Sequence, residues 1–197
     1  FDQGSVENNM WEIGHDISSN SYKFLLEKII NDKNFALIIK PKKPKLLKYK
    51  LGNVYDLLNK AKETGRCLVF ENYSKHHVKN FDDIPAKVAM ASDLTIHDTL
   101  AAGTAGLESA LTGTKSIYFD YFGLKKSQFD DNHLNIVYRD WNILWENVKK
   151  DSEEKLNSLG NWHNIIDKFD SYRDGKTNIR MMNFINKLIK EKNPNFN

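Results

Sequence analysis

The chain has 197 residues, of which 29 are basic and 26 acidic, for a formal net charge of +3. Hydrophobic residues make up 40% and charged residues 28%, which excludes a fully disordered or collagen-like chain. No stretch approaches the roughly 18 consecutive apolar residues of a membrane-spanning helix. The mild charge gives no ground by itself for a nucleic-acid-binding protein.

Five short apolar runs read as buried strands, because each is rich in β-branched or aromatic residues and is bounded by polar or turn residues. They are residues 35–39, 67–70, 94–96, 116–119 and 135–138. Segments with helical periodicity or helix start and stop signals lie between them. The expected helices are one capped by Ser19 or Asn20, 54–62 capped by Asn53, 86–91 after Pro85, 104–111, 141–149 capped by Asp140, and 175–192.

The alternation of strands and helices predicts an α/β, Rossmann-like fold, with a parallel sheet covered by helices on both faces. From Asp151 onward the sequence predicts helices and no strand, so the C-terminal tail is expected to be helical. Ligands of such sheets bind at the carboxyl ends of the strands. The site is therefore expected in the loops that follow Ile39, Phe70, Ile96 and Phe119.

The single cysteine, Cys67, has no partner for an internal disulfide. It lies inside the apolar run 67–70, so a buried core position is expected for it. This cysteine usage is typical of a reducing compartment, and we expect a cytoplasmic protein.

Residues 92–120 carry the strongest functional signal. A strand ends near His97, a loop of small residues follows (Gly103, Thr104, Ala105 and Gly106), and a helix begins at once. The free N–H groups and positive dipole of such a helix start form an anion site that suits phosphate. Glu108 lies one turn inside this helix, where its carboxylate can accept hydrogen bonds from the two hydroxyls of a ribose.

A structural role is the alternative for the same loop. Small residues at Gly103 and Gly106 also allow a helix to pack tightly on a sheet, with no ligand involved. The two readings stay open at the level of the sequence.

This segment resembles the nucleotide-binding stretch in the C-terminal domain of GT-B fold glycosyltransferases, most closely bacterial enzymes of surface and capsular polysaccharide biosynthesis. The matching places fall on Ile96, Gly103-Thr104, Glu108 and Gly113, and residues 105–113 are the specific part. The later run 169–176 also looks like a signature near the end of such proteins.

The resemblance implies one half of a GT-B enzyme that transfers a sugar from a nucleotide-sugar donor to a saccharide or lipid-linked acceptor, in capsule, O-antigen or lipopolysaccharide biosynthesis. It implies no metal and no cofactor beyond the donor. It leaves the catalytic residues unknown and implies that a separate acceptor domain supplies the catalytic base. Residues 1–174 are then the donor-binding domain. Residues 175–197 form a helix that packs on the acceptor domain, and a chain starting at Phe1 is expected to be a fragment.

The resemblance also assigns donor-binding roles outside the helix start. Lys40 and Arg173 are expected near phosphate, Ser5 near the phosphate or sugar, Asp120 near the donor sugar, and His97 toward the ligand. Two of these have structural alternatives, since His97 also suits a near-core histidine and Arg173 also suits an ion pair with Asp170 or Asp174. The stretch 71–84 is expected to hold the nucleotide base, and Tyr73 or Phe81 suits either stacking on that base or packing on the core.

The lysine-rich segment 40–50 has three readings: one lysine contacts the donor phosphate, the cluster attracts an anionic membrane at the inner face of the cell, or it is a solvated loop. Binding of nucleic acid by this segment is disfavoured, because the sequence contains no recognised nucleic-acid-binding motif.

The acidic pairs Asp82-Asp83 and Asp130-Asp131 are expected to be turn residues, not a metal site. Trp141, Trp145 and Trp162 are expected to pack in the core.

Other functions compete with sugar transfer. Nucleotide-sugar 2-epimerases and polyol-phosphate transferases use similar domains and would show the same helix and glutamate. A non-catalytic nucleotide-binding module is a further alternative. A Rossmann oxidoreductase is disfavoured, because its G-x-G-x-x-G motif would follow the first strand.

Overall fold

The computed structural model describes residues 15–70, 84–100, 103–121, 123, 129–130, 133–155 and 158–192, with the side chains of 15–18 excepted. The chain divides into two units, residues 1–162 and 163–197, and each is treated by itself. In the described part, every strand belongs to the first unit.

The strands of the first unit are β1 (Leu37–Ile39), β2 (Cys67–Val69), β3 (Leu94–His97), β4 (Lys115–Phe119) and β5 (Val137–Tyr138). Its helices are α1 (His15–Asn31), α2 (Leu47–Leu51), α3 (Tyr55–Glu63), α4 (Pro85–Met90), α5 (Thr104–Leu111) and α6 (Trp141–Glu154). Two 3-10 helices, η1 (Pro44–Leu46) and η2 (Gly52–Val54), flank α2. The second unit contains η4 (Ile166–Lys168) and α7 (Thr177–Lys192).

The strands pair in parallel, which confirms the α/β prediction. β1 pairs with β2, with Leu37 opposite Cys67, and β3 pairs with β4, with Ile96 opposite Ile117. β5 adds to β4 on the far side from β3, again in parallel. Among the described residues the strands form two small sheets, β1-β2 and β3-β4-β5, where the sequence predicted one.

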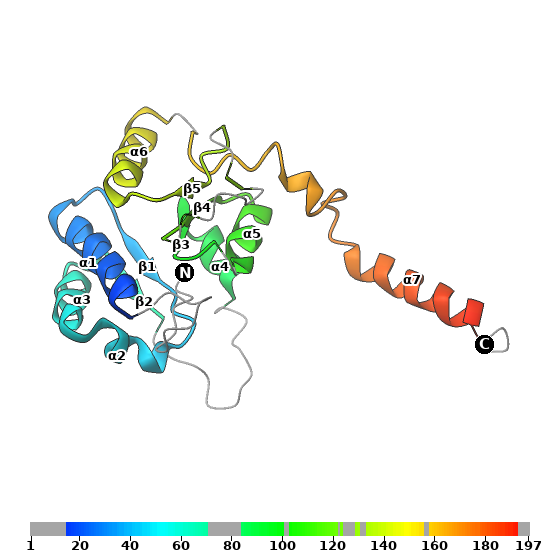
Figure 1. The fold of residues 1–197 in the computed structure, drawn as a ribbon, viewed down its shortest axis with the longest axis horizontal. Coiled ribbons are helices and arrows are strands. Elements are labelled where there is room, and N and C mark those ends of the chain that lie inside the picture. Colours follow the sequence, from blue (N-terminus) through cyan, green and yellow to red (C-terminus); the bar gives the residue numbers. More distant parts are fainter. Residues whose placement is uncertain are drawn as a thin grey trace. The chain divides into compact units, whose positions relative to one another are not determined.

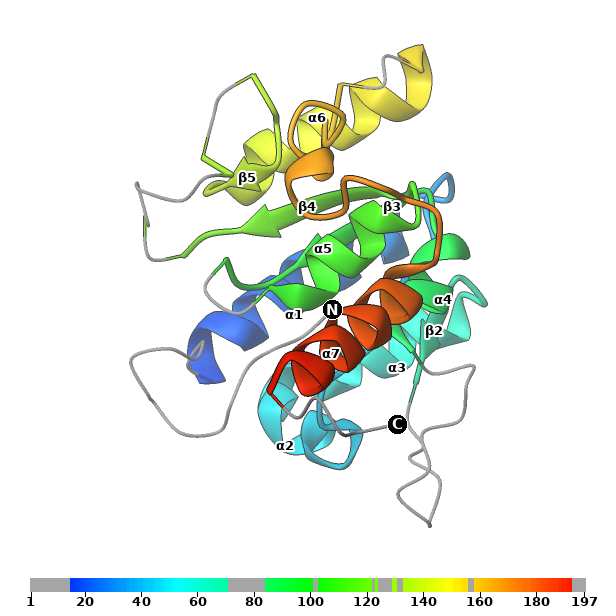
Figure 2. The same cartoon turned by 90° about the vertical axis from the view of Figure 1, so that its right-hand side faces the viewer.

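Helices cover both faces of the strands, as predicted. Figure 1 shows α1, α3 and α6 on one side of the strands and α4 and α5 on the other. In Figure 2 the view is turned, so that α5 lies in front of β3 and β4 and α1 lies behind them. The ring of Phe24 on α1 contacts Trp141 and Trp145 on α6, with ring centroids 5.5 Å and 6.5 Å apart.

Each sheet has its own hydrophobic core. The core around β1 and β2 contains Tyr22, Leu26, Ile39, Leu47, Leu51, Val54, Leu58, Ala61 and Cys67. The core around β4 and β5 contains Ile117, Phe119, Tyr138, Leu144 and Leu159. The tryptophans pack as predicted: Trp145 and Trp162 are buried, and Trp141 stacks on Phe119 with ring centroids 4.2 Å apart.

The predicted helix starts have mixed outcomes. Asp140 caps α6 as expected, since its carboxylate accepts hydrogen bonds from the N–H groups of Asn142 (2.7 Å) and Ile143 (3.0 Å). The cap at Ser19 or Asn20 was wrong, because α1 already begins at His15. Asn53 caps no helix with its side chain, because the backbone is already helical there, in η2.

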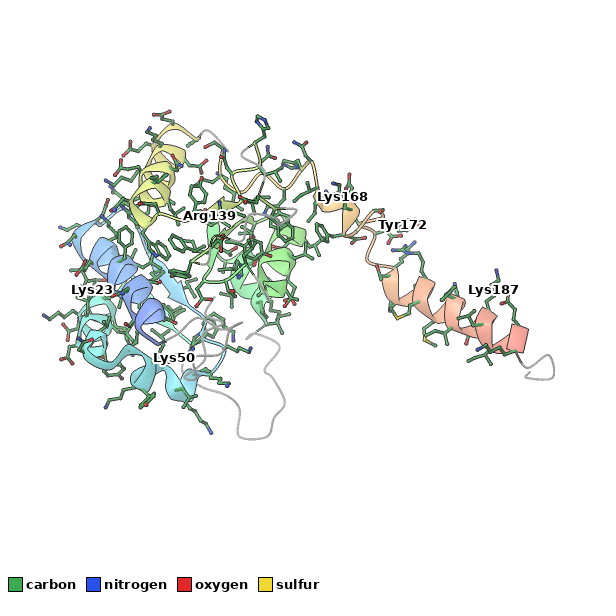
Figure 3. The ribbon with its side chains drawn as sticks, in the orientation of Figure 1. Lys23, Lys50, Arg139, Lys168, Tyr172 and Lys187 are labelled. Carbon is green, nitrogen blue, oxygen red and sulfur yellow. The ribbon has the colours of Figure 1, made fainter. Side chains whose placement is uncertain are left out.

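The solvated loop, one of three readings of residues 40–50, was wrong for the second half of the segment. Residues 44–51 form η1 and α2, and Leu47 and Leu51 enter the core one helical turn apart. Lys50, labelled in Figure 3, is only 1% exposed. The many lysines masked the short apolar periodicity. Among the described helices, none is long and apolar enough to cross a bilayer.

Cys67 lies in the core as predicted, and its burial has a measurable consequence. Burial raises the pKa of the Cys67 thiol from 9.0 to about 11. At pH 8 the thiolate fraction is then about a hundredfold below that of the unfolded chain, since each pKa unit is a factor of ten. We expect the native protein to react at least tenfold more slowly with a thiol reagent at pH 8 than the same protein in urea.

The direction of the pH dependence follows from the same shift. The unfolded thiol ionises above pH 9 while the folded thiol stays protonated, so this group contributes stability below pH 9 that is lost as the pH rises toward 11. Equal reactivity of native and unfolded protein would contradict a buried Cys67. A Cys67→Ala variant gives the background rate.

Candidate functional site

The loop after β3 leads into α5 at the carboxyl edge of the sheet, where the sequence placed the anion site. Gly103 is the N-cap residue and Thr104 is the first residue of the helix. The carbonyl of Gly103 accepts hydrogen bonds from the N–H groups of Gly106 (3.0 Å) and Leu107 (3.4 Å). The N–H groups of Thr104 and Ala105 have no acceptor within the helix, and no side chain caps this end in the described part of the chain.

Both glycines of the loop pack against one aromatic ring. A Cβ atom at Gly103 would lie 2.1 Å from a ring carbon of Tyr118, and one at Gly106 would lie 2.5 Å from another. The Tyr118 hydroxyl donates a hydrogen bond to the Gly103 carbonyl (2.5 Å). Burial raises the pKa of this phenol, so it stays protonated and can donate. The glycines therefore have the packing role that the sequence left open as an alternative.

The two α5 side chains predicted to hold the ligand point to the surface. Thr104 and Glu108 are exposed, whereas Ala105, Gly106, Ser109 and Ala110 are buried. Ser109 donates to the Ala105 carbonyl (2.7 Å), and Ser116 of β4 donates to the Gly106 carbonyl (2.8 Å). The first of these hydrogen bonds lies within α5, and the second joins the helix to the sheet. The carboxylate of Glu108 has no partner among the described residues and faces outward.

His97 ends β3 and is completely buried. Its ring packs against Tyr118, with ring centroids 5.5 Å apart. Burial lowers the pKa of His97 well below its usual range, so the imidazole is neutral. This placement agrees with the near-core alternative and not with a side chain that faces solvent.

Asp120 follows β4 and is held by an arginine. It is 3% exposed, and its carboxylate accepts a hydrogen bond from Nε of Arg139 at 2.9 Å. The other two nitrogens of the same guanidinium donate to both carboxylate oxygens of Asp130, at 3.0 Å and 2.8 Å. Arg139 is labelled in Figure 3. Asp130 is thus tied down by an ion pair, and Asp120 lies fixed at the carboxyl edge of the sheet.

Lys40 and Asp98 follow β1 and β3 directly, and both line the same cavity. The ammonium of Lys40 lies 5.9 Å from the centre of the Phe70 ring. Asp98 adds negative charge near Tyr121, whose pKa is raised first by burial and then by this charge. A basic residue and an acidic residue therefore lie at the carboxyl ends of strands from the two sheets.

The remaining predicted residues lie elsewhere. Arg173 belongs to the second unit. Its guanidinium pairs with the carboxylate of Asp167 (2.9 Å), and its backbone N–H donates to the carboxylate of Asp170 (3.1 Å). The pairing of Arg173 with an aspartate was an expected alternative, although the partner of its guanidinium is Asp167. Ser5 lies outside the described residues, as do residues 71–83 of the stretch 71–84 that was expected to hold the nucleotide base.

Sequence reasoning missed Arg139 and Tyr118. Arg139 follows β5 directly, so its place at the carboxyl edge was the available signal. Tyr118 lies inside a strand, and nothing in the sequence pairs it with a loop 15 residues earlier. No family model matches this chain, and no curated protein or solved structure matches it significantly.

Proposed function

We propose that the chain is the nucleotide-sugar-binding domain of a GT-B fold glycosyltransferase that acts in bacterial surface polysaccharide biosynthesis, in the cytoplasm. One observation carries the proposal. The exposed carboxylate of Glu108 has no described partner and lies one turn beyond an uncapped helix start, at the carboxyl edge of a parallel sheet. The resemblance of residues 92–120 to donor sites supplies the identity of the ligand.

The arrangement suits a nucleoside diphosphate. The N–H groups of Thr104 and Ala105 would donate hydrogen bonds to phosphate oxygens, and the positive end of the α5 dipole would attract their negative charge. Glu108, about one turn further along, would accept hydrogen bonds from the ribose hydroxyls. Negative charge grows on the leaving phosphate as the sugar is transferred, and fixed N–H dipoles stabilise it without reorganisation.

Calorimetric titration with UDP, GDP, CMP, CDP and ADP tests the proposal. We expect selective binding of one base, and a loss of at least about tenfold in affinity in a Glu108→Gln variant, because two hydroxyl donors lose a charged acceptor. Glu63→Gln is the matched control, since Glu63 is an exposed glutamate at the end of α3. Binding that is equal in both variants, or absent from the folded chain for every nucleotide, contradicts the assignment.

A further inference from the structure

The helical segment after β1 has one buried side and one exposed side. η1 and α2 follow each other directly and together cover residues 44–51. Leu47 and Leu51 lie one helical turn apart and are buried in the core, and the Lys50 side chain is buried as well. In Figure 1 and Figure 2 this segment lies at the edge of the first unit. Its other side is therefore a surface of the first unit.

Two rows of exposed side chains follow that outer side. Lys45 and Lys48 are three residues apart, and so are Leu46 and Tyr49, so each pair lies on one side of the helical segment. Leu46 is 36% exposed and Tyr49 is 65% exposed. Two more exposed lysines come just before η1. We call these six residues the lysine face: Lys42, Lys43, Lys45, Leu46, Lys48 and Tyr49.

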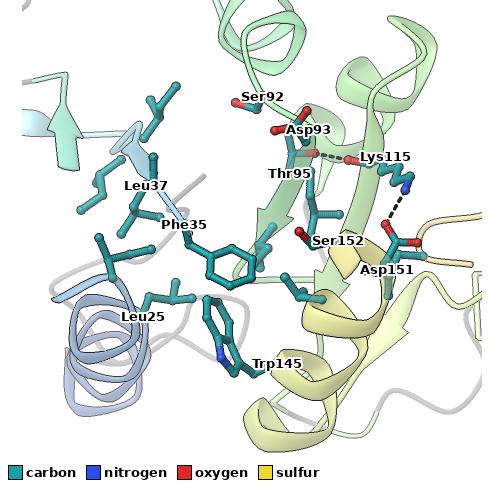
Figure 4. A pocket seen from close by; sticks show the side chains of 18 of the residues that line it. Leu25, Phe35, Leu37, Ser92, Asp93, Thr95, Lys115, Trp145, Asp151 and Ser152 are labelled. Atoms are coloured by element: carbon teal, nitrogen blue, oxygen red, sulfur yellow. Dashed lines mark hydrogen bonds and ion pairs between the residues drawn. The ribbon is translucent and has the colours of Figure 1, made fainter. Parts of the chain in front are cut away.

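The charge of the lysine face is not balanced by nearby acidic residues in the sequence. Residues 33–55 contain seven lysines and no aspartate or glutamate. Elsewhere in the first unit a lysine has a carboxylate partner, since Lys115 pairs with Asp151 (Figure 4). In the described part of the chain no ion pair involves three members of the lysine face: Lys43, Lys45 and Lys48.

An anionic lipid surface matches both kinds of side chain in the lysine face. Each lysine near such a surface raises the affinity by about fivefold, because it attracts acidic headgroups. Tyrosine rings lie at the level of the headgroups, and a neighbouring leucine can enter the boundary with the acyl chains. A soluble polyphosphate would contact the lysines alone and would gain nothing from Leu46 and Tyr49. The combination therefore favours a membrane as the partner.

α7 is the second basic and amphipathic helix of the chain, but its charges are partly paired. The guanidinium of Arg180 pairs with Asp174 at 2.9 Å, and the ammonium of Lys187 lies 3.9 Å from the carboxylate of Glu191. Its charge is therefore partly neutralised within the second unit. The lysine face has the stronger attraction for acidic headgroups.

We propose that the lysine face binds the first unit peripherally to a membrane that contains acidic phospholipids. The lysines contact the headgroup phosphates, and Leu46 and Tyr49 enter the interfacial layer. Lys40 has no part in this contact, because it lines the cavity between the two sheets. Contact of this kind requires no membrane-spanning helix, and the inference does not rest on the proposed function.

Flotation of the 197-residue chain with lipid vesicles tests the proposal. We expect binding to vesicles of phosphatidylglycerol and phosphatidylcholine in equal parts to exceed binding to pure phosphatidylcholine by at least about a hundredfold. Binding should weaken as salt is added, because salt screens exposed charges. A Lys45→Gln, Lys48→Gln double variant should lower the partition coefficient roughly 25-fold. Tyr49→Ser should lower it by at least about threefold, because the ring no longer enters the interface.

A double variant of α7 is the matched control. Lys187→Gln with Lys190→Gln removes the same two charges from the second unit and should change binding by less than about threefold, because only charges at the lipid surface contribute. The midpoint of denaturant unfolding should stay unchanged in every variant, since all these positions are exposed.

Three results would overturn the proposal. Equal binding to neutral and anionic vesicles would exclude attraction to acidic headgroups. Loss of binding in the α7 variant, but not in the Lys45 and Lys48 variant, would place the contact in the second unit. Tighter binding to inorganic polyphosphate than to anionic vesicles, with no effect of Tyr49→Ser on either, would identify a soluble polyanion as the partner.

Discussion

A Gly103→Ala substitution is expected to lower the free energy of unfolding by about 1–3 kcal/mol, because it overfills a packed site. The new Cβ would lie 2.1 Å from the Tyr118 ring, which is 1% exposed and has no room to move aside. Backbone strain does not add to this cost, since the φ angle of Gly103 is −80° and suits any residue. Denaturant unfolding of the purified variant measures the loss.

Variants of Tyr118 separate the steric cause from other effects. In a Tyr118→Leu background the ring is gone, so Gly103→Ala should cost clearly less. In a Tyr118→Phe background the ring remains and only the hydrogen bond to Gly103 is lost, so the full cost should persist. The difference between these cycles is the coupling energy of the contact. An equal cost in all three backgrounds would contradict the packing explanation.

The fold was predictable where local pattern and tertiary environment agree. Each strand of the described part lies within two residues of its predicted position, because buried parallel strands read as short β-branched runs. The helix over 104–111 is found with the same bounds, since Thr104 and Gly113 mark its ends. The short helix α2 was missed, because only Leu47 and Leu51 among its residues are apolar and buried at helical spacing.

The site was predictable only in part, because its groups meet through the fold and not through the sequence. Residues 103–108 are contiguous, so their arrangement at a helix start follows from local rules. The reason for Gly103 and Gly106 is Tyr118, a residue on a strand, and no local pattern reveals that contact. The pairing of Asp120 with Arg139 likewise requires β4 and β5 to be neighbours, which depends on strand order.

Replacement of Arg139 by methionine is expected to lower the free energy of unfolding by about 3 kcal/mol, the low end for removal of one partner of a buried ion pair. Most of this loss comes from Asp120, whose side chain is 1% exposed and loses a 2.9 Å hydrogen bond from Nε. The contacts to Asp130 contribute less, because the Arg139 side chain is 38% exposed and water screens that pair. Chemical unfolding at pH 7 provides the measurement.

Two further variants show whether the buried carboxylate causes the loss. Asp120→Asn introduced into the Arg139→Met protein removes the buried charge and should restore part of the stability, which a merely steric effect of methionine would not allow. Lys149→Met also removes one positive charge, but its ammonium lies 3.7 Å from the exposed Glu146 carboxylate, so a change within about 0.5 kcal/mol is expected. If Arg139→Met costs no more than Lys149→Met, the guanidinium does not hold Asp120.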